Sequence, residues 1–245
     1  MIEHTSFDGT AIAVHELGAG RPVLLLHGLF SSADMNWIRF GHAARLAEAG
    51  FRCIMPDFRV HGQSAAPHDP AAYPEAVLVK DVEHLVSALQ LAAFDLAGFS
   101  MGARTAAGLV ARGMRPRRLL LCGMGWEGLT EWDRRRDFFL TAIDRRDVVK
   151  PGETHYFAAQ FLKSQKIDAV AARLLLESLG PVDAEGLIAA KPDATVICGA
   201  EDDDNGSGRL LADKLGAPFV EVPGTHMSSV TTPELGRAIV TALTR

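Results

Sequence analysis

Residues 93–112 read AFDLAGFSMGARTAAGLVAR, an apolar run followed by a glycine-flanked serine and a helical pattern. The apolar run predicts a strand ending at Phe99, and the pattern from Met101 predicts a helix. A serine on a sharp turn between strand and helix exposes its hydroxyl at the end of a sheet. The helix N-terminus adds positive potential and the free N–H of Met101. Ser100 is therefore the candidate nucleophile, against the alternative of a tight turn that merely needs glycine.

Short apolar runs and helical patterns alternate on both sides of this stretch. Further strands are predicted at 11–16, 22–27, 51–55, 118–122, 195–198 and 219–222. Further helices are predicted at 37–49, 74–90, 207–215 and 232–243. The run at 22–27 is nearly continuous and apolar, as expected for a strand covered on both faces, whereas 11–16 alternates as an antiparallel strand would. The alternation predicts an α/β fold with a mostly parallel sheet and helices on both faces.

The alternation stops between residues 123 and 192. Helical patterns occupy 130–146, 155–165 and 167–179 there, without a strand. We expect these residues, 123–192, to form an inserted helical cap. Residues 1–122 and 193–245 would form the core.

Composition limits the possible partners. The chain has 245 residues, 48% of them hydrophobic, and a formal net charge of -5. A nucleic-acid partner is disfavoured, because phosphate binding needs a clustered basic surface. The one basic run, Arg134, Arg135 and Arg136, is flanked by acidic residues and is interpreted as a solvated helix face. No secretory signal is visible, and apolar runs of about four residues fall far short of a membrane span of about twenty.

Three cysteines, Cys53, Cys122 and Cys198, lie in or at the end of the predicted strands. Buried reduced thiols are expected, which favours a cytoplasmic protein. Their odd number and the absence of a C-x-x-C motif argue against a disulfide framework or a zinc site. No metal or organic cofactor is expected.

A serine hydroxyl is a poor nucleophile until a neighbouring base takes its proton. Of the nine histidines, His226 follows the last predicted strand and precedes the last predicted helix. It is therefore expected at the carboxyl edge of the sheet, with Ser100, and is the predicted base. His42, His84 and His155 fall on predicted helices and are interpreted as surface residues.

The acid that orients the base is expected between the serine and the histidine in the chain. Residues 201–204 are all acidic and follow a predicted strand. Asp202 is the first choice, while Glu201, Asp203 and Glu127 stay open. The acid would hold the imidazole tautomer and stabilise the imidazolium.

The backbone at Leu29 is the predicted second oxyanion donor, beside the N–H of Met101. A strand runs directly into His27-Gly28-Leu29-Phe30, which brings this loop to the same edge of the sheet. His27 is interpreted as a residue that braces the loop.

Aromatic side chains are candidates for an apolar substrate pocket. They are Phe30, Trp126, Trp132 and Phe138, with Phe139 beside them. The alternative, that most of those in the predicted cap pack its own core, stays open. The expected partner is a partly apolar small molecule, and the oligomeric state is not indicated.

Together, several motifs resemble the α/β-hydrolase superfamily, in the branch of small esterases, lactonases, carbon–carbon hydrolases and cofactor-free haloperoxidases. They are HGL at 27–29, DFRVHGQS at 57–64, GFSMG at 98–102, GAED at 199–202 and GTH at 224–226. The resemblance implies hydrolysis of an ester or a similar carboxylic-acid derivative through an acyl-enzyme. Carbon–carbon bond hydrolysis or perhydrolysis by the same triad stays open, as does a ligand receptor built on this fold.

Two positions depart from the superfamily's usual pattern. Val60 stands where glycine is usual, so the conformation of its loop is in question. The usual proline after the acid is absent, and Asn205-Gly206-Ser207 occupies its place. The second departure concerns the motif by which Asp202 is assigned as the orienting acid.

Overall fold

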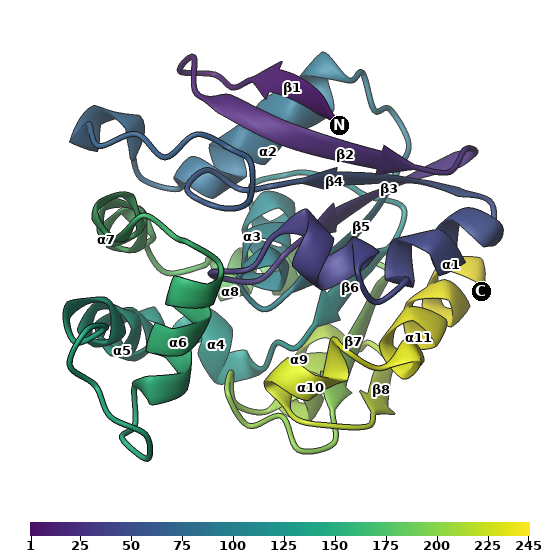
Figure 1. Ribbon diagram of the computed structural model, residues 1–245. Helices are drawn as coiled ribbons and strands as arrows, with labels where there is room; N and C mark the ends of the chain where they lie inside the picture. The colour runs from purple at the N-terminus through teal and green to yellow at the C-terminus, as the bar shows by residue number, and fades with distance from the viewer.

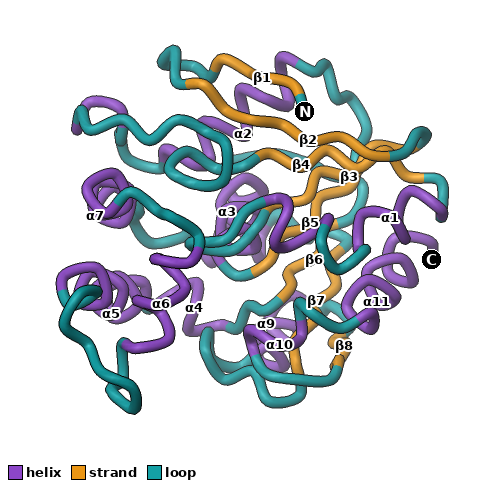
Figure 2. The backbone as a smooth tube through the Cα atoms, in the orientation of Figure 1, coloured by secondary structure: helices purple, strands orange, loops and turns teal.

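An eight-stranded sheet forms the centre of the computed structural model, which describes all of residues 1–245. The strand order is β1-β2-β4-β3-β5-β6-β7-β8, and the strands run as one twisted band through the molecule in Figure 2. From β4 to β8 all neighbours are parallel, while β1 and β2 form an antiparallel edge. The predicted α/β-hydrolase fold, with its mostly parallel sheet, is confirmed.

Each predicted strand is present, and one more precedes them. The strands are β1 (Ile2–Thr5), β2 (Ala11–Leu17), β3 (Arg21–Leu26), β4 (Phe51–Pro56), β5 (Asp95–Phe99), β6 (Leu119–Cys122), β7 (Ala194–Gly199) and β8 (Phe219–Val222). Strands β5, β6 and β7 are buried along their whole length. Helices cover both faces of the sheet, which is why these strands are apolar except at Asp95 and Thr195.

The helices are α1 (His42–Glu48), α2 (Val77–Ala88), α3 (Met101–Ala111), α4 (Trp126–Thr130), α5 (Trp132–Asp144), α6 (Tyr156–Ser164), α7 (Ala169–Ser178), α8 (Ala184–Ala189), α9 (Gly208–Leu215), α10 (His226–Ser229) and α11 (Pro233–Thr244). A π-helical turn (Asp34–Ile38) and a 3-10 turn (Pro70–Ala72) complete the set. None of these helices is both long enough and apolar enough to cross a bilayer.

Two apolar cores lie on opposite faces of the sheet. One joins α1 and α11 to the sheet and includes the fully buried Trp37, Leu46 and Ile239. The other contains buried side chains of α2, α3 and α9, and it continues into α5, α6 and α7. Figure 1 shows α5, α6 and α7 together on the left, on the far side of the molecule from α1 and α11. The helices after β6 therefore share an apolar core with one face of the sheet.

The segment between β6 and β7 contains five helices and no strand. The helix predicted at 130–146 corresponds to α5, while α4 and α8 were not predicted. α8 packs against α3, whereas α5 contacts α6 and α7. The division into a core and a separable cap stays a prediction.

The helix predicted at 37–49 is interrupted. Gly41, with a φ of 77°, separates the π-helical turn from α1. His42, predicted on the surface, is fully buried, and its Nε2 lies 2.6 Å from the carbonyl oxygen of Val230. That interpretation was wrong, because α1 packs against α11 and buries this face of the helix.

The loop after β4 is built around buried charges. Asp57 accepts hydrogen bonds from the amides of Ala33 (2.7 Å) and Gln63 (2.9 Å). Val60 adopts a φ of 77°, so the loop keeps the left-handed turn for which glycine is the usual residue. A β-branched residue is strained there, and burial of the Val60 side chain in the core offsets part of this cost.

Arg59 is fully buried in this loop and pairs with two aspartates. Its guanidinium lies 2.5 Å from Asp81 and 3.0 Å from Asp8. Two hydrogen bonds to Asp81 form a fork, which is the geometry that arginine and carboxylate prefer. The Arg59–Asp81 ion pair therefore joins the loop after β4 to α2.

Asp81→Asn should lower the free energy of unfolding by about 3 kcal/mol, because it leaves a buried guanidinium incompletely compensated. Urea denaturation would measure the loss. Glu234→Gln is the control: it removes an exposed ion pair to Arg237 and should cost less than about 1 kcal/mol. Equal losses in the two variants would contradict the role assigned to Arg59.

Candidate active site

Ser100 lies on the turn between β5 and α3 in a conformation that few residues adopt, with φ 54° and ψ -114°. The close approach of strand and helix explains the two glycines around it. A Cβ atom on Gly98 would overlap the backbone of Gly102, and one on Gly102 would overlap the carbonyl of Leu26. The strained turn therefore exposes the serine hydroxyl at the carboxyl end of the sheet.

His226 and Asp202 complete a hydrogen-bonded chain with Ser100. The Nε2 atom of His226 lies 3.0 Å from the serine Oγ, and Nδ1 lies 2.9 Å from an oxygen of Asp202. A carboxylate only accepts hydrogen bonds, so Nδ1 carries the ring hydrogen. Nε2 is then free to accept the serine hydroxyl. The side chains of His226 and Asp202 are 8% and 2% exposed, so their hydrogen bond is shielded from water.

His226 was expected in a loop. It is instead the first residue of a short helix, α10, which was not predicted. Thr225 and Ser228 cap this helix reciprocally, each side chain accepting a hydrogen bond from the other's backbone amide. The ring of Phe99 packs at 5.0 Å from the imidazole. These contacts hold the imidazole against the end of β5.

The other acids considered for the same position lie elsewhere. Glu127 accepts a hydrogen bond from the amide of Ser207 at 2.8 Å and none from His226. Glu201 and Asp203 are exposed and make no contact with the histidine. Asp202 is the one of the four whose carboxylate meets the imidazole.

The two predicted oxyanion donors are free to bind a ligand. Met101 is the first residue of α3 and Leu29 lies in the loop after β3, and no hydrogen bond within the protein uses either amide. The backbone of Gly28 approaches Ser100 so closely that an added Cβ would lie 3.6 Å from the serine Cβ. The loop that carries Leu29 therefore reaches the serine, and the assignment of the two amides as an oxyanion hole stays a prediction.

His27 fixes the direction of the Leu29 amide. Its Nε2 accepts from the amide of Phe58 at 2.9 Å, so its Nδ1 carries the hydrogen and donates to the carbonyl of Gly28 at 2.8 Å. That carbonyl and the Leu29 N–H belong to one trans peptide group and point in opposite directions. Burial lowers the pKa of His27, which keeps the imidazole in the neutral form that this arrangement needs.

Two asparagines, the only ones in the chain, contact the site and were not predicted as site residues. Asn36 accepts from the amide of Gly28 at 2.9 Å. Asn205 donates to the carbonyl of Gly123 at 2.8 Å, and the same nitrogen lies 3.4 Å from the serine Oγ. Both side chains are buried. The available signal was the scarcity of asparagine together with the unusual residues after Asp202.

A small cavity of about 20 Å³ adjoins Ser100. Of the predicted pocket aromatics, Trp132 lines it, together with Leu29 and Phe139. Phe30, Trp126 and Phe138 are absent from its lining. Phe30 is buried and packs edge-on against Phe139, so it lies behind the cavity wall.

The three cysteines are free, buried thiols. Burial raises the pKa of Cys53 and of Cys198 to about 12, so neither thiol is a nucleophile at neutral pH. No cluster of three or more His, Cys, Asp or Glu side chains has the arrangement of a metal site.

The sequence matches a family model described as "alpha/beta hydrolase fold" over residues 21–120. The 2-hydroxymuconate semialdehyde hydrolase of Pseudomonas sp. (strain CF600) is 31% identical over 226 residues, covering 79% of this chain and 75% of that protein. The chain belongs to the α/β-hydrolase superfamily. An epoxide hydrolase of Caballeronia sordidicola is 38% identical over 96 residues, which are 39% of this chain and only 28% of that relative's length.

Solved structures of other superfamily members share the fold. The enol-lactonase from Burkholderia xenovorans LB400 has a TM-score of 0.75 at 24% identity, with complete coverage of both chains. The esterase EaEST from Exiguobacterium antarcticum has a TM-score of 0.78 at 20% identity, with 99% coverage of both chains. At these identities the two solved structures show the shared fold and do not specify a reaction.

Asn205→Leu should lower the free energy of unfolding by about 1–3 kcal/mol, because the carbonyl of Gly123 loses its buried donor. Urea denaturation would measure this. Gln160→Leu, which changes an exposed amide on α6 in the same way, should stay within about 0.5 kcal/mol of the native value. Similar values for both variants would mean that the Asn205 contact contributes nothing.

Proposed function

We propose that this protein is a serine hydrolase that cleaves an ester, or a similar carboxylic-acid derivative, through an acyl-enzyme on Ser100. The observation that carries the proposal is the unbroken chain from Asp202 through His226 to Ser100, with both contacts at 2.9–3.0 Å. Fold alone would not support it, since related folds carry many functions. A shielded base that already meets the serine hydroxyl is an arrangement that nucleophilic catalysis needs.

In the first half-reaction the Oγ of Ser100 attacks the substrate carbonyl while its proton passes to Nε2 of His226. The carbonyl oxygen becomes an oxyanion, which the amides of Leu29 and Met101 stabilise. The tetrahedral intermediate collapses by breaking the bond to the leaving group. His226 returns its proton to that group, which departs as an alcohol.

In the second half-reaction a water molecule takes the alcohol's place. His226 removes a proton from the water as it attacks the acyl carbon, and the second tetrahedral intermediate expels the serine oxygen. The proton returns to Ser100 and the carboxylic acid leaves. Asp202 stays ionised throughout, holding Nδ1–H and stabilising the imidazolium.

Helices α4 to α7 are proposed as the substrate-facing cap. Support comes from Trp132 and Phe139 of α5, which contribute to the cavity that Ser100 lines. Their apolar surfaces suit a partly apolar small molecule.

Carbon–carbon bond hydrolysis is the second candidate. The relative that aligns along 79% of this chain is named as a semialdehyde hydrolase, not as an esterase. One nucleophile would serve both reactions, so the site alone does not distinguish them. Parallel assays with p-nitrophenyl esters and with diketones would show which bond the enzyme cleaves. A ligand receptor is disfavoured, since a receptor does not need the complete chain of three residues.

Ser100→Ala should lower kcat for p-nitrophenyl ester hydrolysis by about 10³-fold or more, because the acyl-enzyme cannot form. Circular dichroism and thermal melting serve as folding controls, since a smaller residue fits the turn. A fluorophosphonate should label the native protein at Ser100, as located by peptide mass spectrometry. Half-native activity in the alanine variant, or labelling at another residue, would overturn the proposal.

Asp202→Asn and Glu127→Gln form a matched pair of neutralising substitutions. Asp202→Asn should lower kcat by about 10⁴-fold, because the amide favours the wrong imidazole tautomer. Glu127→Gln should lower it less than about tenfold, since this carboxylate contacts Ser207 and not His226. The reverse pattern in kcat would transfer the orienting role to Glu127.

A further inference from the structure

Two arginines line the cavity beside Ser100, and neither of them forms an ion pair. Arg104 and Arg135 both contribute to its wall, and no aspartate or glutamate does. The chain as a whole carries a net charge of -5, so a positive cavity is not a consequence of overall composition. The charge is concentrated where the substrate would bind.

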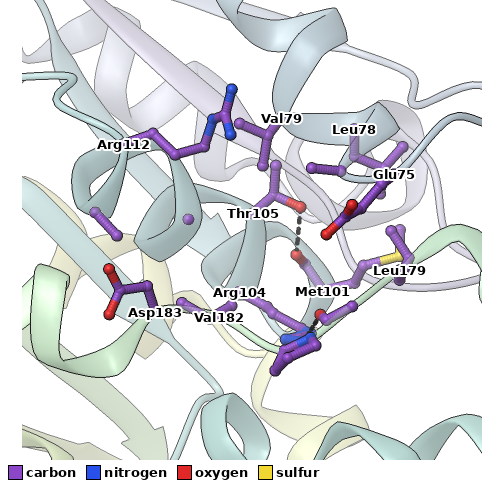
Figure 3. A pocket seen from close by; sticks show the side chains of 15 residues that line it. Glu75, Leu78, Val79, Met101, Arg104, Thr105, Arg112, Leu179, Val182 and Asp183 are labelled. Carbon is purple, nitrogen blue, oxygen red and sulfur yellow. Dashed lines mark hydrogen bonds between the residues drawn. The ribbon is translucent and has the colours of Figure 1, made fainter.

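Arg104 lies on α3 one turn after Ser100, and its amide donates to the serine carbonyl at 2.9 Å. The residue is 5% exposed. Its guanidinium packs on the Trp132 ring at 4.5 Å and donates through Nη2 to the carbonyl of Gly180, a bond drawn in Figure 3. Nη1 is buried and has no partner. Burial lowers the pKa of Arg104 to about 10, which leaves the side chain charged at neutral pH.

Arg135 departs from the interpretation of its basic run as a solvated face. Its neighbour Arg136 forms exposed ion pairs with Asp133 and Asp137. Arg135 makes no ion pair, and its guanidinium lies 5.0 Å from the centre of the Phe139 ring on the cavity wall. One arginine of the run therefore faces the site.

A buried guanidinium without a counter-ion costs free energy, and proteins normally pair such groups. Arg59, which is fully buried in this chain, has two aspartates against it. Arg104 has only a carbonyl and an aromatic ring. Its Nη1 is a donor without an acceptor, and a planar guanidinium binds a carboxylate through two parallel hydrogen bonds.

Arg104 and Met101 also line a second cavity of about 190 Å³ between α2, α3 and residues 179–183. Figure 3 shows Glu75 and Asp183 at the wall of this larger cavity. An anion is therefore better placed on the Ser100 side of Arg104, because no aspartate or glutamate lines that cavity. The carboxylate charges that act on Arg135 are those of Asp204 and Asp202, which lie outside the lining.

We propose that the substrate carries a carboxylate, held by Arg104 and Arg135, in addition to the bond that Ser100 attacks. A monoester of a dicarboxylic acid has this chemistry. The proposal rests on the proposed serine hydrolase, and it specifies the class of substrate for that site.

The test compares charged and uncharged esters that differ by one methyl group. The mono-p-nitrophenyl esters of adipic and suberic acids carry a free carboxylate, and their methyl p-nitrophenyl diesters do not. The native enzyme should show a kcat/KM about thirtyfold or more higher for the charged ester at one chain length or both, as expected for a charge-assisted hydrogen bond. Equal kcat/KM values for charged and uncharged esters at both lengths would overturn the proposal.

Variants then assign the preference to particular residues. Arg104→Met and Arg135→Met should each lower the charged-to-uncharged ratio by about tenfold, and Arg104→Lys should give an intermediate ratio. Because the ratio is taken within one protein sample, partial loss of folded enzyme cancels. Arg237→Met, at an exposed position on α11, is the control and should keep the native ratio. A native ratio in both methionine variants at the site would also overturn the proposal.

A binding measurement tests the anion site independently of the proposed ester hydrolysis. Ser100→Ala protein should bind monomethyl adipate or monomethyl suberate at least about tenfold more tightly than the dimethyl ester in calorimetry. Such binding, together with a native protein that hydrolyses no ester, would overturn the esterase and retain the anion site. Hydrolysis of uncharged esters, without preference in either kinetics or binding, would overturn the anion site alone.

Discussion

The close approach of β5 to α3 is the constraint on which the rest of the site depends. Gly98 and Gly102 permit it, and the left-handed conformation of Ser100 is its consequence. The same turn presents the serine hydroxyl, frees the amide of Met101 at the helix N-terminus and starts the helix that carries Arg104. Strain at one residue is thus stored where several groups must converge. The parallel strands around β5 supply the rigidity that maintains this strain.

Buried polar side chains hold the loops around this turn through backbone hydrogen bonds. Asn36 accepts from the Gly28 amide and His27 donates to the Gly28 carbonyl, so the peptide groups on both sides of Gly28 are held, including the one that carries the Leu29 amide. In the loop after β6, Asn205 donates a hydrogen bond to the carbonyl of Gly123. Each bond satisfies a backbone group that would otherwise be buried without a partner. The loops are therefore ordered before a substrate arrives, which lowers the cost of stabilising an oxyanion.

Regular local patterns made most of the fold predictable. Buried parallel strands are continuous apolar runs, and the positions of Ser100, Asp202 and His226 follow from the strands that precede them. The failures have a common cause, which is tertiary contact. His42 has the sequence context of a surface helix and is buried by α11. Likewise, Arg135 and Arg136 are equivalent in a charge pattern, and only packing against Phe139 distinguishes the one that lines the cavity.

The missing proline after Asp202 has a structural explanation that also accounts for Glu127. Gly206 occupies the place of that proline with a φ of 77°, which proline cannot adopt. A Cβ at this position would overlap the side chain of Glu127. The amide of Ser207 donates to that carboxylate, and further backbone bonds join residues 205–207 to residues 126–128. The loop that carries Asp202 is thus anchored to α4 by the Glu127 carboxylate, at the place where the superfamily usually has a proline. A carboxylate after β6 is then a support for the loop that carries Asp202, and its presence in the sequence does not make it a second orienting acid.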